Sequence, residues 1–250
     1  MNEAKPASRA FEEYAADGVL VLGGAAAILL QLGDPVVARG VAAHSSFATD
    51  PLRRMRTTLS YLYAVSLGTA RQAERMAVLV DRAHDGVPGS TDPDRQLWVA
   101  ATLYRVGVDV HELIRGQLPA ALGDEIYAAF ERVGTALQLP PGAWPADRVA
   151  FESYWTEAVA ALEVSEPART VARDLLRPRA IPWWARPAMP LVRTLTAGLL
   201  PGPVREAYGL AGHPRRFRAA VRFVRMLAAV APRRIRELPA RTLLARIPAQ

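Results

Sequence analysis

The feature that most constrains the fold is an almost continuous series of segments with helical periodicity. Apolar residues recur every three or four positions along most of the 250 residues, and no run of alternating β-branched residues breaks the series. Asp50-Pro51 and Asp92-Pro93 are typical of helix starts, and Gly68 and Gly116 of helix ends. The sequence therefore predicts an all-α fold built as a single large domain.

The periodicity predicts helices over these ranges: Arg9–Tyr14, Val19–Leu32, Pro35–His44, Asp50–Gly68, Ala70–Ala83, Asp92–Arg115, Gly123–Leu137, Ala146–Glu163, Glu166–Leu175, Met189–Leu199, Pro201–Tyr208, His213–Val230 and Pro232–Arg246. Leu139-Pro140-Pro141-Gly142 and the segment from Arg177 to Pro182 are breaks that a helix does not cross.

Composition narrows the kinds of protein and of site. There is no cysteine, which excludes disulfides, zinc–thiolate sites, iron–sulfur clusters and thiolate-ligated heme. The most apolar run, Val19–Leu32, is shorter than the roughly 20 residues that span a bilayer, so it predicts a buried core helix. The first residues lack the pattern of a signal peptide. We therefore expect a cytoplasmic protein without a transmembrane helix.

The positive charge lies at the C-terminal end. The net charge is +7, but residues 214–250 hold ten arginines and a single acid, Glu237. That segment carries +9 and the remainder −2, so the charge does not indicate that the body binds nucleic acid. We divide the chain into a helical domain over 1–213 and an arginine-rich helical extension over 214–250. The extension could pack on the body, lie peripherally on an anionic membrane, or bind nucleic acid without sequence specificity.

The segment after Asp50 carries a polar helix face. Helical spacing places Arg53, Arg56 and Thr57 on one side, with Ser60 one turn further along. Leu52, Met55, Leu59 and Leu62 form a neighbouring apolar face suited to the core. Two adjacent arginines favour an anionic or polar partner, such as a carboxylate, a heme propionate or an oxygen-derived ligand. Ordinary ion pairs with nearby acids account for them equally well.

His84 ends the next predicted segment, in Asp81-Arg82-Ala83-His84-Asp85-Gly86-Val87-Pro88-Gly89. A histidine at a helix C-terminus often only interacts with the terminal carbonyls. A neutral imidazole is also the standard proximal ligand of heme iron, and Asp81 or Asp85 could hold its second nitrogen. The local residues leave both interpretations open.

The order of motifs resembles the MpaB-like oxygenase family, which includes the latex-clearing proteins that cleave rubber. The similarity runs through residues 29–45 and 47–58, then through Ala-His-Asp-Gly-Val-Pro-Gly (83–89) and 92–103. It continues with Glu-Ser-Tyr-Trp (152–155) and 199–210, and so covers nearly the whole chain in order.

The resemblance implies a globin-like helical core around a heme b pocket, with dioxygen as co-substrate. Matching the family's His-x-x-Val-x-Gly motif makes His84 the expected iron ligand. The family's distal Arg-x-x-Lys-Thr element matches Arg53, Arg56 and Thr57, with Arg56 in the lysine's place. A guanidinium stays protonated and does not ligate iron, so we expect an open or water-filled sixth position. The family pattern also suggests His44 and Trp98 beside the heme, although for His44 a capping or core role is the simpler interpretation.

Two classes of function follow. The first is a heme-dependent oxygenase acting on a hydrophobic organic substrate, with Arg53, Arg56 and Thr57 steering oxygen or the polar end of the substrate. The glutamate that the latex-clearing enzymes are thought to use as a base has no counterpart that we can place, so the resemblance does not extend to rubber as the substrate. The second is a non-catalytic helical protein of the same fold without heme, which binds an apolar ligand or a membrane. His111, between Asp109 and Glu112, and His213, before a proline, are expected to be structural or exposed.

Overall fold

The computed structural model describes residues 7–44, 51–87, 89–136, 139–178 and 182–248, without the side chains of residues 44, 51, 52 and 54. Across these residues the chain forms α-helices and two short 3₁₀ helices, with no strand, so the predicted all-α fold is confirmed. The helices are α1 (Arg9–Ala15), η1 (Gly18–Gly23), α2 (Gly24–Gln31), α3 (Pro35–His44), α4 (Pro51–Leu67), α5 (Ala70–His84), α6 (Pro93–Arg115), α7 (Ala120–Thr135), α8 (Arg148–Ala160), α9 (Glu166–Leu176), η2 (Trp183–Ala188), α10 (Met189–Leu199), α11 (Gly202–Ala207), α12 (Pro214–Val230), α13 (Arg233–Arg236) and α14 (Leu238–Leu244).

Two predicted helices are broken in the structure. The segment Val19–Leu32 is divided into η1 and α2, which meet where Gly23 lies against α6. The segment Pro232–Arg246 is divided into α13 and α14, with Pro239 at the start of α14, where its missing N–H costs no helical hydrogen bond. The short helix η2 has no counterpart among the predicted helices. Its six residues include a proline and follow another, and they are too few to show helical periodicity.

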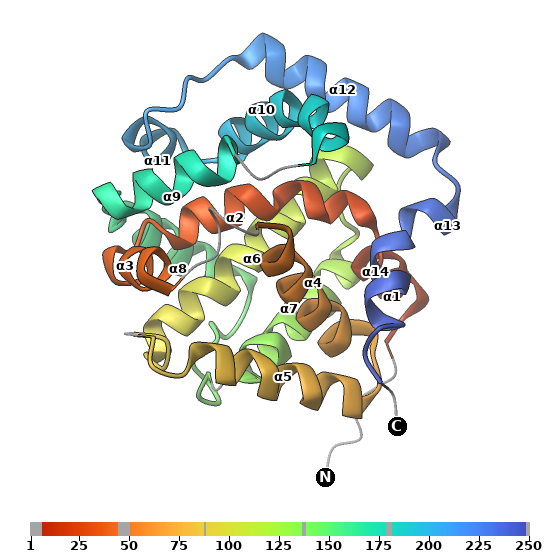
Figure 1. The fold of residues 1–250 in the computed structure, drawn as a ribbon. Helices are drawn as coiled ribbons and strands as arrows, with labels where there is room; N and C mark the ends of the chain where they lie inside the picture. The colour runs from red at the N-terminus through yellow and green to blue at the C-terminus, as the bar shows by residue number, and fades with distance from the viewer. Residues whose placement is uncertain (1–6, 45–50, 88, 137–138, 179–181, 249–250) are drawn as a thin grey trace.

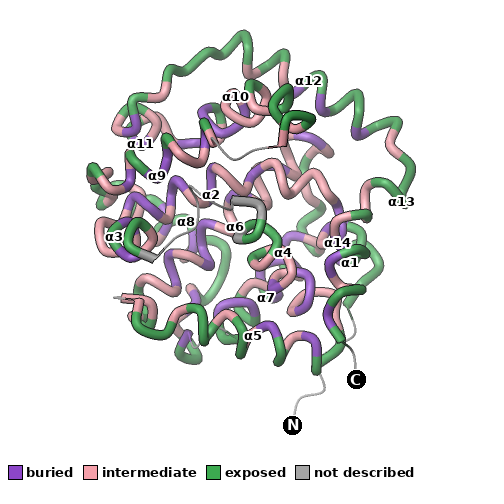
Figure 2. Tube along the Cα trace, viewed as in Figure 1, coloured by how far each residue is buried: buried purple, intermediate pink, exposed green. Residues whose placement is uncertain are grey.

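The longest helix, α6, runs through the middle of the molecule (Figure 1). It contacts η1, α2, α7, α10 and α12, which surround it on several sides. Residues on these helices are the most buried, as the purple stretches of α2 and α6 show (Figure 2). The predicted core role of the apolar run is confirmed, since Leu29, Leu30 and Leu32 are almost fully buried.

Aromatic side chains fill the space between α6, α7 and α8. The Tyr104 ring meets the rings of Tyr127, Trp144 and Phe151 nearly at right angles, with centroids 4.8–5.9 Å away. Edge-to-face packing of this kind adds to the free energy gained by burying the rings. This cluster fixes α6 relative to α7 and α8.

The C-terminal end closes back onto the N-terminal half. Gln72, at the start of α5, is buried, and its Nε2 donates to the carbonyls of Leu244 at 3.2 Å and Ile247 at 2.9 Å. Arg233 forms an ion pair with Glu13 of α1 at 3.4 Å, and α14 packs along α4. The predicted boundary at residue 213 stays a prediction, but helices on both sides of it share contacts.

No single helix of the described chain is both long enough and apolar enough to cross a bilayer. One bent pair, Arg9–Ala15 with Gly18–Gln31, passes the same criteria of length and composition, with an angle of 41° between its parts.

Adjacent glycines at the η1–α2 junction should respond in opposite ways to substitution. A Cβ at Gly23 would lie 2.5 Å from Val106 Cγ1, whereas a Cβ at Gly24 would meet nothing within 4 Å. We expect Gly23→Ala to lower the free energy of unfolding by about 1–3 kcal/mol through overpacking. Gly24→Ala, at a helical position, should be neutral or stabilising by up to about 1 kcal/mol. Urea unfolding of both variants tests this, and equal effects would contradict the close approach.

Candidate functional site

A cavity opens between the N-terminal helices and the centre of the molecule. It comprises about 1120 Å³ of empty space when the open mouth and the solvent in it are counted. Its walls come from α1, η1, α2, α4, α6 and α7, and they are mostly apolar. The lining includes Phe11, Leu20, Ile28, Met55, Leu59, Leu62, Leu103, Val106 and Phe130.

The cavity exists partly because Gly24 has no side chain. Gly24 lies on the wall with helical backbone angles, and the space beside its Cα is empty. Gly23, the neighbouring residue, instead lets η1 approach α6 closely. Gly23 thus brings η1 close to α6, and Gly24 leaves space beside α2.

Few polar groups line this cavity. Tyr14 and Tyr63 both contribute to the wall, and their hydroxyls are buried without a hydrogen-bond partner in the described part of the chain. Burial raises the pKa of Tyr63 to about 12, and it raises the pKa of Tyr14 as well, so both phenols remain protonated donors at neutral pH. Gln31 is engaged, since its Nε2 donates to Thr102 Oγ1 at 3.0 Å.

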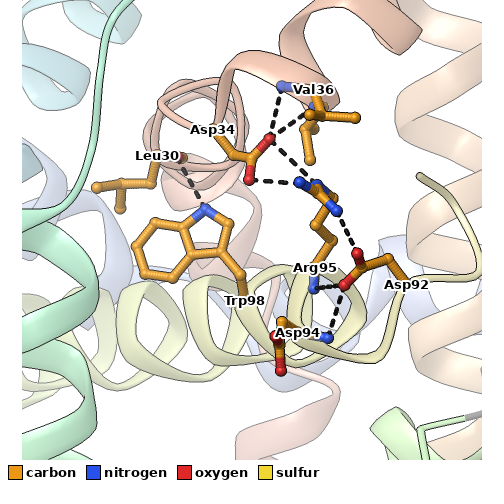
Figure 3. A network of polar contacts seen from close by, with 8 residues as sticks. Leu30, Asp34, Val36, Asp92, Asp94, Arg95 and Trp98 are labelled. Carbon is orange, nitrogen blue, oxygen red and sulfur yellow. Dashed lines mark hydrogen bonds and ion pairs between the residues drawn. The ribbon is translucent and has the colours of Figure 1, made fainter. Parts of the chain in front are cut away.

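A second polar assembly surrounds the loop that follows His84 (Figure 3). Asp34 caps α3 by accepting hydrogen bonds from the backbone N–H groups of Val36 at 2.7 Å and Val37 at 2.9 Å. The same carboxylate pairs with Arg95 Nε at 3.4 Å, and Arg95 Nη1 bonds to Asp92, the N-cap of α6. One arginine thus joins the starts of α3 and α6.

Gly89 fits between these helix starts. Its φ is +79°, which favours glycine, and a Cβ there would lie 2.7 Å from Val36 Cγ1 and 3.2 Å from Arg95 Cδ. Gly86 also has a positive φ, +74°, but open space around it. The structure therefore explains the glycine of the His-x-x-Val-x-Gly motif: only glycine lets the loop contact both α3 and α6 at this position.

The backbone of His84 is held by groups other than its own ring. The carbonyl of His84 accepts hydrogen bonds from Ser90 Oγ at 2.9 Å and from Val87 N at 3.0 Å. Ser90 is fixed in turn, because Gln96 Nε2 donates to its carbonyl at 3.0 Å. The carbonyl at the end of α5 is thus satisfied by the loop that follows it.

The predicted arginine face lies on α4, away from the cavity. Arg53 and Arg56 are exposed and Thr57 is half-buried; none of them lines the cavity. The Thr57 hydroxyl donates to the carbonyl of Arg53 at 3.2 Å. Toward the cavity α4 presents its opposite side, with Met55, Thr58, Leu59 and Leu62. Helix α4 is followed directly by α5, which packs against it and ends at His84.

The remaining predicted residues lie as follows. Trp98 is buried; its Nε1 donates to the carbonyl of Leu30 at 3.2 Å, and its ring stacks on Trp155 with centroids 5.3 Å apart. The side chain of His44 lies outside the described residues. His111 is half-buried beside Tyr14, and burial lowers its pKa, so its ring is neutral at pH 7. His213 is exposed, in agreement with the expectation for a turn residue.

The donor chemistry at His84 fits a heme iron. A neutral imidazole is the common proximal ligand of a b-type heme, and the backbone of His84 is fixed at the end of α5. Throughout the described ranges, no group of three or more His, Asp or Glu side chains gathers to hold a metal ion directly. Residues 45–50, which precede α4 and its arginine face, lie outside the described residues.

The cavity itself was not predicted from the sequence. Tyr14, Gln31 and Tyr63 are far apart in the chain, and nothing in their local patterns places them around one space. The one local signal was the Gly23-Gly24 pair inside an otherwise apolar helix, since an isolated glycine there often marks close packing or a ligand.

Comparison with known proteins agrees with these features. The family model described as "ER-bound oxygenase mpaB/B'/Rubber oxygenase, catalytic domain" matches residues 12–229. Uncharacterized proteins of Mycobacterium tuberculosis and Mycobacterium bovis are each 34% identical over 227 residues, which cover 84% of this chain and 89% of the relative. No solved structure matches. The chain belongs to this oxygenase family.

The two glycines of the His84 loop allow a matched test of its packing. Gly86→Ala meets only the unfavourable positive φ, which costs about 1–2 kcal/mol of unfolding free energy. Gly89→Ala adds the contacts with Val36 and Arg95, and should cost about 1–3 kcal/mol more. Thermal and urea unfolding measure the difference. Equal losses would show that Gly89 is not packed between α3 and α6.

Proposed function

We propose that this member of the MpaB and rubber oxygenase family is a heme-dependent oxygenase, which uses dioxygen to oxidise a hydrophobic organic molecule. The observation that carries the proposal is the apolar cavity between the N-terminal helices and α6, in a chain that matches the oxygenase family model over residues 12–229. An apolar cavity with few polar groups suits such a substrate.

In this proposal His84 holds the cofactor. A bound heme supplies the iron at which dioxygen is activated. The chain contributes the imidazole and its fixed position, which rests on the hydrogen bonds of Ser90 and Val87 to the His84 carbonyl. Gly89 and Arg95 hold the following loop against α3 and α6, so the imidazole is supported by the packed body.

Arg53, Arg56 and Thr57 are proposed to serve the polar side of the reaction. Guanidinium groups donate hydrogen bonds but do not ligate iron, so Arg56 is assigned to steering oxygen or a polar end of the substrate. Both arginines are exposed, and the Thr57 hydroxyl bonds to the backbone of its own helix. To be steered by these residues, oxygen or the polar end of the substrate must therefore reach the outer face of α4.

Helix α4 separates the two parts of the proposed site. Met55 and Thr58 line the cavity, while Arg56 and Thr57, adjacent in sequence, point to other sides of the same helix. The cavity is assigned to the apolar body of the substrate and the His84 side to the cofactor.

One observation favours a second candidate function. The cavity is lined by no histidine, and His84, Arg53, Arg56 and Thr57 all lie outside its wall. A non-catalytic protein that binds an apolar ligand would need only this cavity. The two candidates differ in whether heme binds, and in whether the cavity ligand is consumed.

Removal of the imidazole tests the oxygenase proposal. The protein, produced with 5-aminolevulinate in the medium, should show a Soret band, and His84→Ala should lose it while keeping its helical circular dichroism. His213→Ala, which changes an exposed histidine, should keep the band. Added imidazole should restore absorbance to the His84→Ala protein. A band that survives in His84→Ala would contradict the assignment, and the absence of any band in the wild type would favour the second candidate.

Filling the cavity tests the substrate site separately. Gly24→Leu places a side chain into the empty space beside α2 without a backbone clash. We expect the affinity for the apolar fluorophore N-phenyl-1-naphthylamine to fall about tenfold, equivalent to about 1.4 kcal/mol. Ala128→Leu, on the exposed face of α7, serves as the size-matched control. Equal binding by both variants would show that the fluorophore does not enter this cavity.

A further inference from the structure

Helix α12 has two apolar stripes, and only one of them is covered. The structure buries Val221, Val224 and Ala228 on one side of the helix, and leaves Leu227 exposed. The second stripe is made by Phe223, Met226, Leu227 and Val230, whose spacing places them on one side of the helix. All four are exposed, Val230 at 74%. This stripe has no partner in the described part of the chain.

Two tryptophans lie at the same end of the molecule. Trp183 and Trp184 of η2 are 79% and 66% exposed, and η2 leads directly into α10. The ring of Phe217, near the start of α12, rests on Gly198, near the end of α10, so the two helices run antiparallel. The start of α10, with η2, therefore lies toward the last turns of α12 (Figure 1). We call Trp183, Trp184, Phe223, Met226, Leu227 and Val230 the α12 patch.

This surface is presented by a firmly attached helix. Arg115 of α6 donates through Nη1 to the carbonyl of Ala228 at 2.8 Å, and through Nε to the buried carboxylate of Asp17 at 2.8 Å. Arg225 donates to the carbonyl of Leu113 at 2.7 Å. Together with the buried valines, these bonds fix α12 on α6. The patch is thus exposed while α12 is packed on α6, without any unfolding of the helix.

Arginines surround the exposed stripe. Arg215, Arg216, Arg218, Arg222 and Arg225 lie on α12 itself, which has no acidic residue. In the described part of the segment from residue 214 onward, the ion pairs are those of Arg233 with Glu13 and Glu237. Among the described residues, the α12 arginines therefore have no acidic partner, and all five are exposed, as the apolar stripe is.

We propose that the α12 patch and its arginines dock this protein onto an anionic lipid bilayer. Tryptophan and aliphatic side chains enter the interface between headgroups and acyl chains, and arginines bind the anionic headgroups. Arginine stems also lie comfortably along apolar surfaces while their guanidinium groups stay in water. A nucleic acid would use the arginines but would leave the aliphatic stripe exposed, so the combination of the two favours lipid.

Substitutions, not truncation, provide the test, because α12 buries Val221, Val224 and Ala228 in the main core. The charge variant is Arg215→Gln/Arg216→Gln/Arg222→Gln. Its matched control is Arg71→Gln/Arg75→Gln/Arg132→Gln, which removes three exposed arginines from α5 and α7, on the side of the molecule away from α12 (Figure 1). The apolar variant is Trp184→Ser/Met226→Ser/Val230→Ser, and Val149→Ser on α8 is its control.

Co-sedimentation is measured with vesicles of phosphatidylcholine alone and with vesicles that also contain phosphatidylglycerol. The wild type should bind only the anionic vesicles, and added salt should weaken the binding. The charge variant should lose about a hundredfold in affinity, and the apolar variant should bind more weakly but with an unchanged salt dependence. Both controls should bind as the wild type does.

Three results would overturn the proposal. The first is equal binding to neutral and anionic vesicles. The second is an equal loss of affinity in the remote arginine control, which would indicate a response to net charge alone. The third is wild-type lipid binding by the apolar variant together with tight binding of sheared duplex DNA that the charge variant abolishes. That result would assign the surface to nucleic acid.

Discussion

The arrangement of the candidate site depends on one guanidinium, that of Arg95. It pairs with Asp34, which caps α3, and with Asp92, which caps α6, and its stem covers Gly89 in the loop after α5. The start of α3 and the start of α6, which are far apart in the sequence, are thereby held at one point (Figure 3). The side chains are partly exposed, so the ion pairs add little to the free energy of unfolding. Their effect is geometric, because they fix where the chain around His84 can lie.

From that point the fold builds outward along α6. Helices α2, η1, α7 and α12 pack against it, and the cavity forms where η1, α2 and α4 do not close fully around its middle. The chain that surrounds this cavity belongs to an oxygenase family. Arg53, Arg56 and Thr57 lie on the face of α4 that does not line this space, and His84 does not line it either.

Helix periodicity and capping residues predicted most of the helices. Helices α3, α6, α9 and α10 each begin with a proline or a polar capping residue, and these signals can be recognised in the sequence alone. The breaks at Gly23 and Pro239 were missed, since the periodicity continues across both. Spacing correctly placed Arg53, Arg56 and Thr57 on one face, but did not reveal that this face is largely exposed and lies away from the cavity. Burial and cavities arise from contacts between distant segments, such as Gly23 with Val106, which a single sequence does not encode locally.

The buried amide of Gln72 has a consequence for how fast the fold can form. Its two acceptors, the carbonyls of Leu244 and Ile247, lie 172 and 175 residues away along the chain. Until this long loop closes, the start of α5 lacks part of its cover, and α4 lacks the helix that packs along it. Closing so long a loop costs chain entropy before the contacts repay it, so contacts of this kind slow folding. We therefore expect the pairing of α14 with α4 and α5 to be among the slower steps in the folding of this protein.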